Sequence, residues 1–525
     1  MEHIELLVFG LLLAIAGLAV LAGVLRVPYP ITLVLGGTVI GFLPGVPTVE
    51  LDPDIVLLIF LPPLLYGAAF FTSVRELRQN ARAIATLAIP LVFVTMAAVA
   101  VVAHEVVGLG WAESFVLGAI VSPTDAVAPA EILRRVGAPR RLLAIVEGEN
   151  LTNDWTALIL YRVAIAAVVS GSFSLWKAGL EFIASGIGGL VVGLAAGWVI
   201  RQVRSRIDDP PTEITISILS GYAGYLPAEE LGFSGVIAAV TTGIYMAWYT
   251  PQLTTPVMRL QGVAIWEILT FLLNALLFLL VGLQLPGILD NLSGRPAGEL
   301  LLWGALVSLV VIAVRLVWMF TTPYLIRLVD RRESQREMRV PAGPRLVVGW
   351  AGMRGSVSLA AALAIPLETD AGANFPERDL IIFLAFAVIL VTLVGQGLTL
   401  RPLIDWVGLE DDGQESREDT LARRRVAEAA LARLDEIGEP DWVSAESVGR
   451  AHNFFDYRQR RFGALEDPDG DDFEDRVNAW RRLMYELFDA QREALLELRN
   501  NGDISDDVRR RVERDLDLEE SRLEN

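Results

Sequence analysis

Residues 147–154 read Glu-Gly-Glu-Asn-Leu-Thr-Asn-Asp and open an apolar run, residues 155–169, that only Arg162 interrupts. Three acids and two amides are costly in a membrane-length segment, because a charged group at the bilayer centre costs at least ~2.5–3.5 kcal/mol. On a helix Asn150 and Asp154 share one face, and Glu149 and Asn153 share the neighbouring face. The stretch therefore predicts a functional helix with one face for an ion and another that ties it to a partner helix.

The composition of the chain is that of an integral membrane protein. Of its 525 residues 53% are hydrophobic, and the mean hydropathy is +0.47. The chain has no cysteine, which excludes disulfide and thiol chemistry, and its three histidines are scattered. Neither a nucleophile–base pattern nor a phosphate loop stands out, so we expect no enzyme and no cofactor.

The negative charge of the chain is concentrated at its C-terminal end. The net charge is −19, and residues 410–525 hold 33 of the 63 acidic residues but only 19 of the 44 basic ones. We therefore divide the chain into a transmembrane domain, residues 1–405, and an acidic tail, residues 410–525, whose apolar residues recur at helical spacing. The tail disfavours nucleic acid as a partner. It is either an inert appendage or a support for a dimer or a regulatory partner.

Thirteen segments are candidate transmembrane helices, since a span needs about 20 apolar residues. They cover residues 4–24, 29–44, 54–72, 83–107, 112–133, 142–169, 178–203, 213–230, 232–249, 262–283, 299–327, 343–366 and 379–403. The predicted fold is an all-α polytopic membrane protein with a helical cytoplasmic tail. In the seventh segment a small residue recurs every four positions, at Ser185, Gly189, Gly193 and Gly197. This stripe allows close packing, either in a dimer or within one protomer.

Charge in the loops indicates the orientation. Arginines gather after odd-numbered segments, whereas acids dominate the loops between them. Positive loops stay in the cytoplasm, so we expect the N-terminus outside and the C-terminus in the cytoplasm of a multi-pass plasma membrane protein. The regular alternation supports an odd number of spans.

Two of the predicted spans carry helix-breaking sequences at corresponding places. Segment 112–133 contains Ser-Pro-Thr-Asp at residues 122–125, and segment 343–366 contains Gly-Met-Arg-Gly at residues 352–355. They lie seven spans apart and therefore run in opposite directions, as in the inverted repeats of secondary transporters. We expect two inverted six-helix repeats with crossed broken helices and the seventh span as a linker.

Asp154 is the predicted carrier residue. A buried carboxylate is stable when it is neutralised, either by a proton or by a small cation, which is the minimum machinery of an exchanger. Asn150 and Thr124 add neutral oxygens, which hard cations prefer, so Asp154 and Thr124 are the expected ligands of a transported ion. The alternative is a carboxylate that only pairs with an arginine. Arg162 is eight residues away, about 12 Å along a helix, which is too far for a direct pair with Asp154.

Arg354 needs an acidic partner, because an unpaired buried arginine is costly. Glu149 is the best candidate and Asp125 the second, since Asp125 also suits the helix N-termini of the crossing. Other polar residues in the spans remain open: Glu267 and Asn274, for which an interfacial acid is the plain interpretation of Glu267, and Arg162 and Arg315.

Three motifs together resemble the monovalent cation:proton antiporter family, which includes the NhaP-type and NHE-type sodium/proton exchangers. They are Ser-Pro-Thr-Asp-Ala-Val-Ala at residues 122–128, the stretch at 147–154, and Gly-Met-Arg-Gly-Ser-Val-Ser-Leu at residues 352–359. The resemblance covers about residues 1–405. It implies a thirteen-span fold and a homodimer in which a core domain moves against a dimerisation domain.

The resemblance also implies roles for single residues. Asp154 would carry the ion or proton with Asn153 as its partner, and this Asn-Asp pair is similar to the electroneutral branch of the family. Thr124 and Asp125 would belong to the first unwound crossing, and Glu149 and Arg354 would form a structural ion pair. Two departures bear on ion selectivity. Asn150 stands where the family usually has serine, and Gly67 stands where it often has an acid.

The resulting hypothesis is an antiporter that exchanges sodium, lithium or potassium for protons by alternating access, for pH and cation homeostasis. A potassium-preferring antiporter is one alternative. Another is a sodium-coupled organic anion symporter on a related fold, although few unpaired cations are present to meet an anion. A channel or sensor is a third. The expected partners are a second copy of the chain, membrane lipid, and the transported cations and protons.

Overall fold

A computed structural model of the chain describes residues 2–44, 53–171, 175–329, 341–409, 413–438, 442–464, 471–501, 503 and 505–524. The chain divides into two compact units, Met1–Asp411 and Asp412–Asn525. Throughout these ranges the regular structure is helical, apart from one isolated bridge between Glu368 and Asn374. Part of the arginine-rich loop after predicted segment 299–327, residues 330–340, and residue 410, the first residue of the predicted tail, lie outside the described residues.

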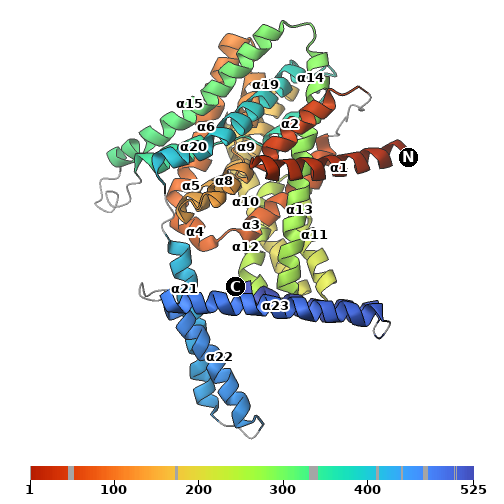
Figure 1. Cartoon of the computed structure of the whole chain (residues 1–525). Helices are drawn as coiled ribbons and strands as arrows, with labels where there is room; N and C mark the ends of the chain where they lie inside the picture. The colour runs from red at the N-terminus through yellow and green to blue at the C-terminus, as the bar shows by residue number, and fades with distance from the viewer. Residues whose placement is uncertain are drawn as a thin grey trace. The chain divides into compact units, whose positions relative to one another are not determined.

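The first unit has a helix or a pair of helices at each predicted apolar segment (Figure 1). In its first half they are α1 (Glu2–Leu25), α2 (Tyr29–Gly41), α3 (Pro53–Phe71), α4 (Val74–Gln79), α5 (Ala81–Ala88), α6 (Pro90–Val102), the π-helical turn η1 (Ala103–Val107), α7 (Trp111–Val121), α8 (Val127–Arg135) and α9 (Arg140–Ser170). The second half comprises α10 (Leu175–Arg204), α11 (Pro210–Glu230), α12 (Gly235–Leu253), α13 (Pro256–Leu283), α14 (Leu285–Asn291), α15 (Ala297–Val329), α17 (Ala342–Trp350), α18 (Ser356–Leu363), α19 (Arg378–Leu390), the π-helical turn η2 (Val391–Gln396) and α20 (Gly397–Val407).

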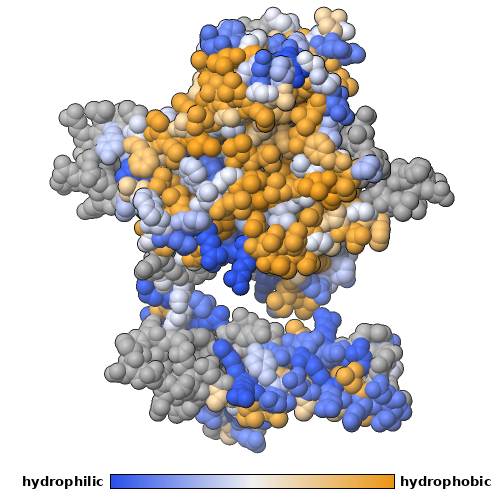
Figure 2. All heavy atoms as spheres, turned by 45° about the horizontal axis from the view of Figure 1, so that its top comes forward, coloured by the Kyte–Doolittle hydropathy of each residue, from blue (hydrophilic) through white to orange (hydrophobic). Residues whose placement is uncertain are grey.

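Within the described ranges, five helical stretches are long and apolar enough to cross a membrane by length and composition. They are Ala81–Val107, Gly179–Arg204, Pro256–Asn291, Ala297–Tyr324 and Arg378–Val407. Apolar side chains also cover most of the visible face of the first unit (Figure 2). On α10, for example, Ile187, Val191 and Trp198 are all more than half exposed. Such a surface is stable in contact with lipid.

Both predicted helix breaks are present. The chain unwinds between α7 and α8, at residues 122–126, and between α17 and α18, at residues 351–355. Pro123 contributes to the first break, because it has no backbone N–H to continue the helical hydrogen bonds, whereas Ser122 before it is still in a helical conformation. The second contains Gly352 and Gly355, and glycine weakens a helix. The two breaks leave four half-helix ends inside the unit.

The helices of the first unit pack as two groups. In the scaffold group, which we define as α2, α3 and α10–α13, α2 packs along α13 and α12 packs along α3, α10 and α11. In the crossing group, defined as α5–α9 and α15–α20 with the two breaks, α7 packs along α6, α9 and α19. The small-residue stripe of α10 faces α12: a Cβ added at Gly189 or Gly193 would meet α12 backbone at Ser234 or Ala238. The stripe therefore serves packing within the protomer.

The second unit consists of four amphipathic helices, α21 (Gln414–Ile437), α22 (Ala445–Ala464), α23 (Asp471–Asn500) and α24 (Asp506–Glu524). They pack in pairs, α21 with α22 and α23 with α24. Phe488 is buried, and Arg492 of α23 forms ion pairs with Asp517, at 2.7 Å, and with Glu520 of α24. The tail thus has helices with small cores of their own, as its apolar spacing predicted.

Candidate functional site

The two unwound segments cross and are bonded to each other. The backbone N–H of Asp125 donates to the carbonyl oxygen of Met353, at 2.8 Å. The Asp125 carboxylate accepts a hydrogen bond from the backbone N–H of Val127, at 2.7 Å, at the start of α8. A negative charge is favoured there, because the N-terminal end of a helix is electropositive. Asp125 therefore caps one half-helix at the point where both breaks meet.

Gly355 is required by this crossing. A Cβ at Gly355 would overlap the carboxylate of Asp125. We expect Gly355→Ala to push Asp125 off the start of α8 and to lower stability by about 1–3 kcal/mol, the usual cost of overpacking. The measurement is thermal unfolding of the purified protein. Gly287→Ala is the matched control, because a Cβ there meets nothing within 4 Å; equal unfolding temperatures for the two variants would contradict the prediction.

Arg354 caps the other half-helix of the same broken pair. Its Nε–H donates to the carbonyl oxygen of Val121, the last residue of α7, at 2.7 Å, and its Nη1–H donates to that of Gly352, at 2.8 Å. Its backbone N–H donates to the hydroxyl of Thr392, at 3.0 Å. The end of α7 carries unsatisfied carbonyls, so a buried cation there is stabilised by the helix dipole as well as by hydrogen bonds.

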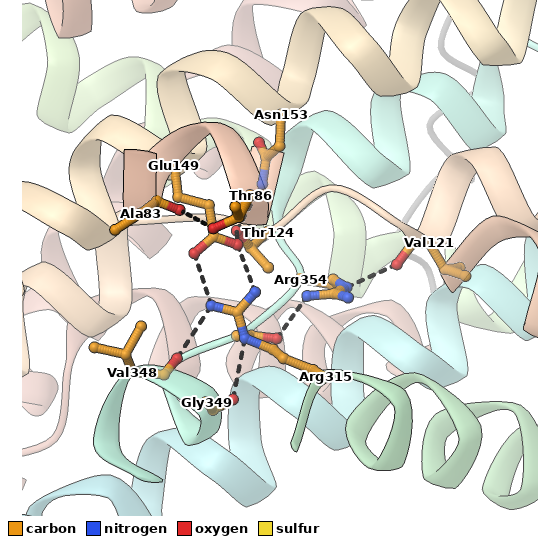
Figure 3. A network of polar contacts seen from close by, with 11 residues as sticks. Ala83, Thr86, Val121, Thr124, Glu149, Asn153, Arg315, Val348, Gly349 and Arg354 are labelled. Atoms are coloured by element: carbon orange, nitrogen blue, oxygen red, sulfur yellow. Dashed lines mark hydrogen bonds and ion pairs between the residues drawn. The ribbon is translucent and has the colours of Figure 1, made fainter. Parts of the chain in front are cut away.

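Arg315 of α15 does the same for α17 and also holds the acid of α9. Its Nε–H and Nη2–H donate to the carbonyl oxygens of Gly349 and Val348, each at 3.1 Å. Its guanidinium forms a two-pronged ion pair with Glu149, of which the Nη2–Oε2 distance is 2.8 Å. Both side chains are almost fully buried. Figure 3 shows this network, with Arg354 beside Arg315.

The expected ion pair between Glu149 and Arg354 is therefore corrected. Arg315 is the direct partner of Glu149, whereas Arg354 bonds to backbone carbonyls. The prediction assumed that only an acid compensates a buried arginine. The carbonyls that a broken helix leaves free at its C-terminal end were expected to hold an ion, whereas Arg354 occupies them.

Asn153 and Thr124 connect this ion pair to the crossing. The side-chain amide of Asn153 donates to the hydroxyl of Thr124, at 2.7 Å, and that hydroxyl donates to Glu149 Oε1, at 3.2 Å. All three side chains are buried, and within the described part of the chain the side-chain carbonyl oxygen of Asn153 has no hydrogen-bond partner. The face of α9 that carries Glu149 and Asn153 is thus bonded to the crossing through neutral side chains and through one acid whose charge an arginine compensates.

Asp154 lies one residue further, at the wall of a cavity of about 660 Å³. Asn150, Thr124 and Asp125 line the same cavity. Asp154 is only 2% exposed, and it lies near enough to Asp125 for the two negative charges to repel each other. Unlike Glu149, Asp154 has no arginine bonded to it among the described residues. The predicted ion residues Asp154, Asn150, Thr124 and Asp125 therefore line one cavity, whereas Asn153 turns towards the ion pair.

The scaffold group supplies the opposite wall of the cavity. Asn274 and Glu267 of α13 line it; Asn274 is buried and Glu267 is exposed, as an interfacial acid is. At Gly67 of α3 a Cβ would lie 3.1 Å from the ring of Trp266, which also lines the cavity and whose indole N–H donates to Ser217, at 3.1 Å. A side chain at position 67 would displace this tryptophan. The ring of Trp266 therefore fills the space that glycine leaves open.

Sequence reasoning missed three residues of the site. Arg315 was left open, although its position in the middle of segment 299–327 already required a buried partner. Trp266 and Glu131 belong to no motif; Glu131 lines the cavity and forms an ion pair with Arg135 of the same helix, at 2.5 Å. Only the packing of α13 and α8 around the cavity reveals them.

The chain matches proteins of one family along most of its length. The family model for the transmembrane part of sodium/hydrogen exchangers matches residues 10–406. A protein of Mycobacterium tuberculosis described as an uncharacterized Na(+)/H(+) exchanger is 38% identical, over 98% of this chain and 97% of its own length. The Na(+)/H(+) antiporter ApNhaP of Aphanothece halophytica is 31% identical, over 85% of this chain and 83% of its own.

A solved structure has the same fold. The sodium proton antiporter MjNhaP1 from Methanocaldococcus jannaschii superposes with a TM-score of 0.59 and 21% identity, over 77% of this chain and 98% of that one. The multi-pass helical fold, the two crossed breaks and the family match agree with one another. The chain belongs to the sodium/hydrogen exchanger family.

Proposed function

We propose that the protein exchanges a monovalent alkali cation, sodium in the first place, for protons. The observation that carries this proposal is the placement of Asp154, a carboxylate 2% exposed at the wall of a cavity, to which none of the described arginines is bonded. Such a group is stable only when a proton or a cation neutralises it. Asn150 and Thr124 supply uncharged oxygens beside it, which suit a hard cation.

The exchange is one cation for one proton and therefore electroneutral. Asp154 is the one carrier carboxylate of the proposal, because Asn153 is neutral and Glu149 is compensated by Arg315. Neutral Asp154 and cation-loaded Asp154 carry the same net charge, so both forms cross the barrier, while the bare carboxylate does not. Alternating access follows if the crossing group moves against the scaffold group with Asp154 at their boundary.

The full transmembrane architecture is part of the same proposal. Thirteen spans, arranged as inverted repeats of spans 1–6 and 8–13, account for the two breaks and for the match to the antiporter fold. The arginines at the end of α8, Arg134 and Arg135, lie at the cavity, so by the positive-inside rule the cavity opens to the cytoplasm. The N-terminus is then outside, the tail is cytoplasmic, and the protein acts as a homodimer in the plasma membrane with the tail as a support or regulatory element.

The experiment uses purified protein in liposomes with an imposed inside-acid pH gradient. We expect sodium, lithium or potassium chloride to collapse the gradient, choline chloride to leave it intact, and the rate to be the same with the membrane voltage clamped at zero or at a negative value. No collapse with any alkali cation would contradict antiport. That outcome would favour the solute symporter, whose signature is sodium uptake that depends on an organic anion.

Asn150 sets the preference among cations in this proposal. We expect Asn150→Ser to change the ratio of the apparent sodium and potassium affinities by about tenfold or less, since one oxygen ligand is exchanged for another at about 1.4 kcal/mol or less. The measurement is the cation concentration for half-maximal gradient collapse. Asn291→Ser, a substitution on α14 that does not line the cavity, is the control; an unchanged ratio in Asn150→Ser would remove Asn150 from the ion site.

A further inference from the structure

An apolar cluster that joins the two helix groups borders the cavity. Leu61 and Leu65 of α3, Tyr225 of α11 and Ala239 of α12 are buried together, and Leu158 of α9 packs against them. Leu61 and Leu65 also line the cavity, so the cluster forms part of its wall. We call these residues the plug.

One helical turn beyond the plug, an ion pair joins α9 and α11, two of the helices that contribute to the plug. Arg162 follows Leu158 by four residues on α9, and Glu229 follows Tyr225 by four residues on α11. The Nη2–H of Arg162 donates to both carboxylate oxygens of Glu229, each at 2.6 Å. The Oε1 atom of Glu229 also accepts the backbone N–H of Gly235, at 2.9 Å, at the start of α12. Glu229 is thus bonded within the scaffold group, and its bond to Arg162 links that group to the crossing group.

One face of α9 therefore carries residues of the cavity, the plug and the ion pair in that order. Asn150 and Asp154 line the cavity, Leu158 belongs to the plug, and Arg162 forms the ion pair, each one turn after the other. Access to Asp154 from the far face of the protein requires α9 to part from α11 and α12. The plug and the ion pair must then both open.

We propose that Arg162 and Glu229 form a clasp that keeps the far side of the cavity closed. The proposal rests on the proposed alternating access and adds the device that biases it. The side chains of the pair are 46% and 26% exposed, so water competes with the bond and the clasp is weak enough to open in every cycle. A fully buried pair such as Arg315 with Glu149 lies inside the crossing group and does not need to break.

The absence of native cysteine allows a direct test. Ala239 is fully buried in the plug, so Ala239→Cys is a mild reporter that reacts only when the plug opens. A membrane-impermeant maleimide is offered to intact cells and, separately, to inverted membrane vesicles. In the Arg162→Gln background we expect labelling from the Arg162 face to be about two- to fivefold faster, the range for a partly exposed ion pair. Glu229→Gln should act likewise, and the double variant should add little.

Two variants control for changes other than loss of the clasp. Arg162→Lys keeps the charge and should label more slowly than Arg162→Gln. Arg140→Gln removes an arginine of the same helix whose bond, also at 2.6 Å, goes to Glu76 of α4 and not to the scaffold group, so it should not change labelling. The Glu229→Gln variant carries the test if Arg162→Gln fails to elute as a folded protein on size exclusion.

Equal labelling of the Arg162→Gln and parent proteins would overturn the clasp, as would an equal acceleration by Arg140→Gln or an acceleration only from the cavity side. Labelling needs no transported cation, so its result is separate from that of the liposome assay. A clasp variant that labels faster in a protein that moves no proton would uphold the clasp and contradict antiport.

Discussion

Asp154→Asn is expected to reduce cation-driven collapse of the pH gradient to the level of empty liposomes. The amide has the shape of the carboxylate, but it neither binds a proton in this pH range nor neutralises a cation. The site then has no charge change to couple the two ions. The substitution removes a buried acid to which no arginine is bonded in the part of the chain that the structure describes, so the variant should be at least as stable as the parent protein. Loss of transport with intact folding distinguishes a carrier from a structural residue.

Two controls sharpen this prediction. Asp154→Glu keeps the carboxylate and should retain measurable exchange with an altered cation affinity. Asp405→Asn removes an exposed acid on α20 that does not line the cavity, and it should transport at the parent rate. Exchange at parent rates in Asp154→Asn would refute the carrier role of this residue.

Arg315→Gln is expected to destabilise the protein by about 3–5 kcal/mol, because it leaves the Glu149 carboxylate buried without its cation. Adding Glu149→Gln should restore most of that loss, since two neutral side chains avoid the unpaired charge. The measurement is a double-mutant cycle on thermal or denaturant unfolding of the purified protein.

The same double-mutant cycle with Arg354 is the control. It distinguishes the observed pairing of Glu149 with Arg315 from the pairing of Glu149 with Arg354 that the sequence predicts. Arg354→Gln removes bonds to the carbonyls of Val121 and Gly352, so Glu149→Gln should not rescue it. A rescue of Arg354→Gln by Glu149→Gln as large as that of Arg315→Gln would show that Arg354 is the energetic partner of Glu149 after all.

Much of the fold was predictable because its signals are local. Apolar runs marked the places of the helices, and Pro123 and Gly352 marked the two breaks, since both residues act on their own stretch of backbone. The face that joins Asn150 to Asp154 followed from helical periodicity alone. Helix ends within the broken spans were also anticipated, with Asp125 at an N-terminal end, but Arg354 and Arg315 as partners of the C-terminal ends were not.

The rest depends on contacts between distant segments, which no single stretch of sequence encodes. Arg315 and Glu149 are 166 positions apart, and Arg354 reaches a carbonyl 233 positions away. Trp266 fills the space over Gly67 only because α13 packs beside α3. The pairing of charges inside a membrane unit therefore required the three-dimensional arrangement, whereas the identity of the charged residues did not.

In the proposed exchange one carboxylate, that of Asp154, holds either a proton or a cation. The most direct measurement is the release of protons when sodium is added to weakly buffered purified protein, followed with a pH indicator or by calorimetry in two buffers. We expect up to one proton to be released per bound cation in the parent protein. The amount should fall as the pH rises, because the site then holds fewer protons. The Asp154→Asn variant should release none. Cation binding without proton release at any pH, or undiminished release in Asp154→Asn, would contradict the proposed exchange.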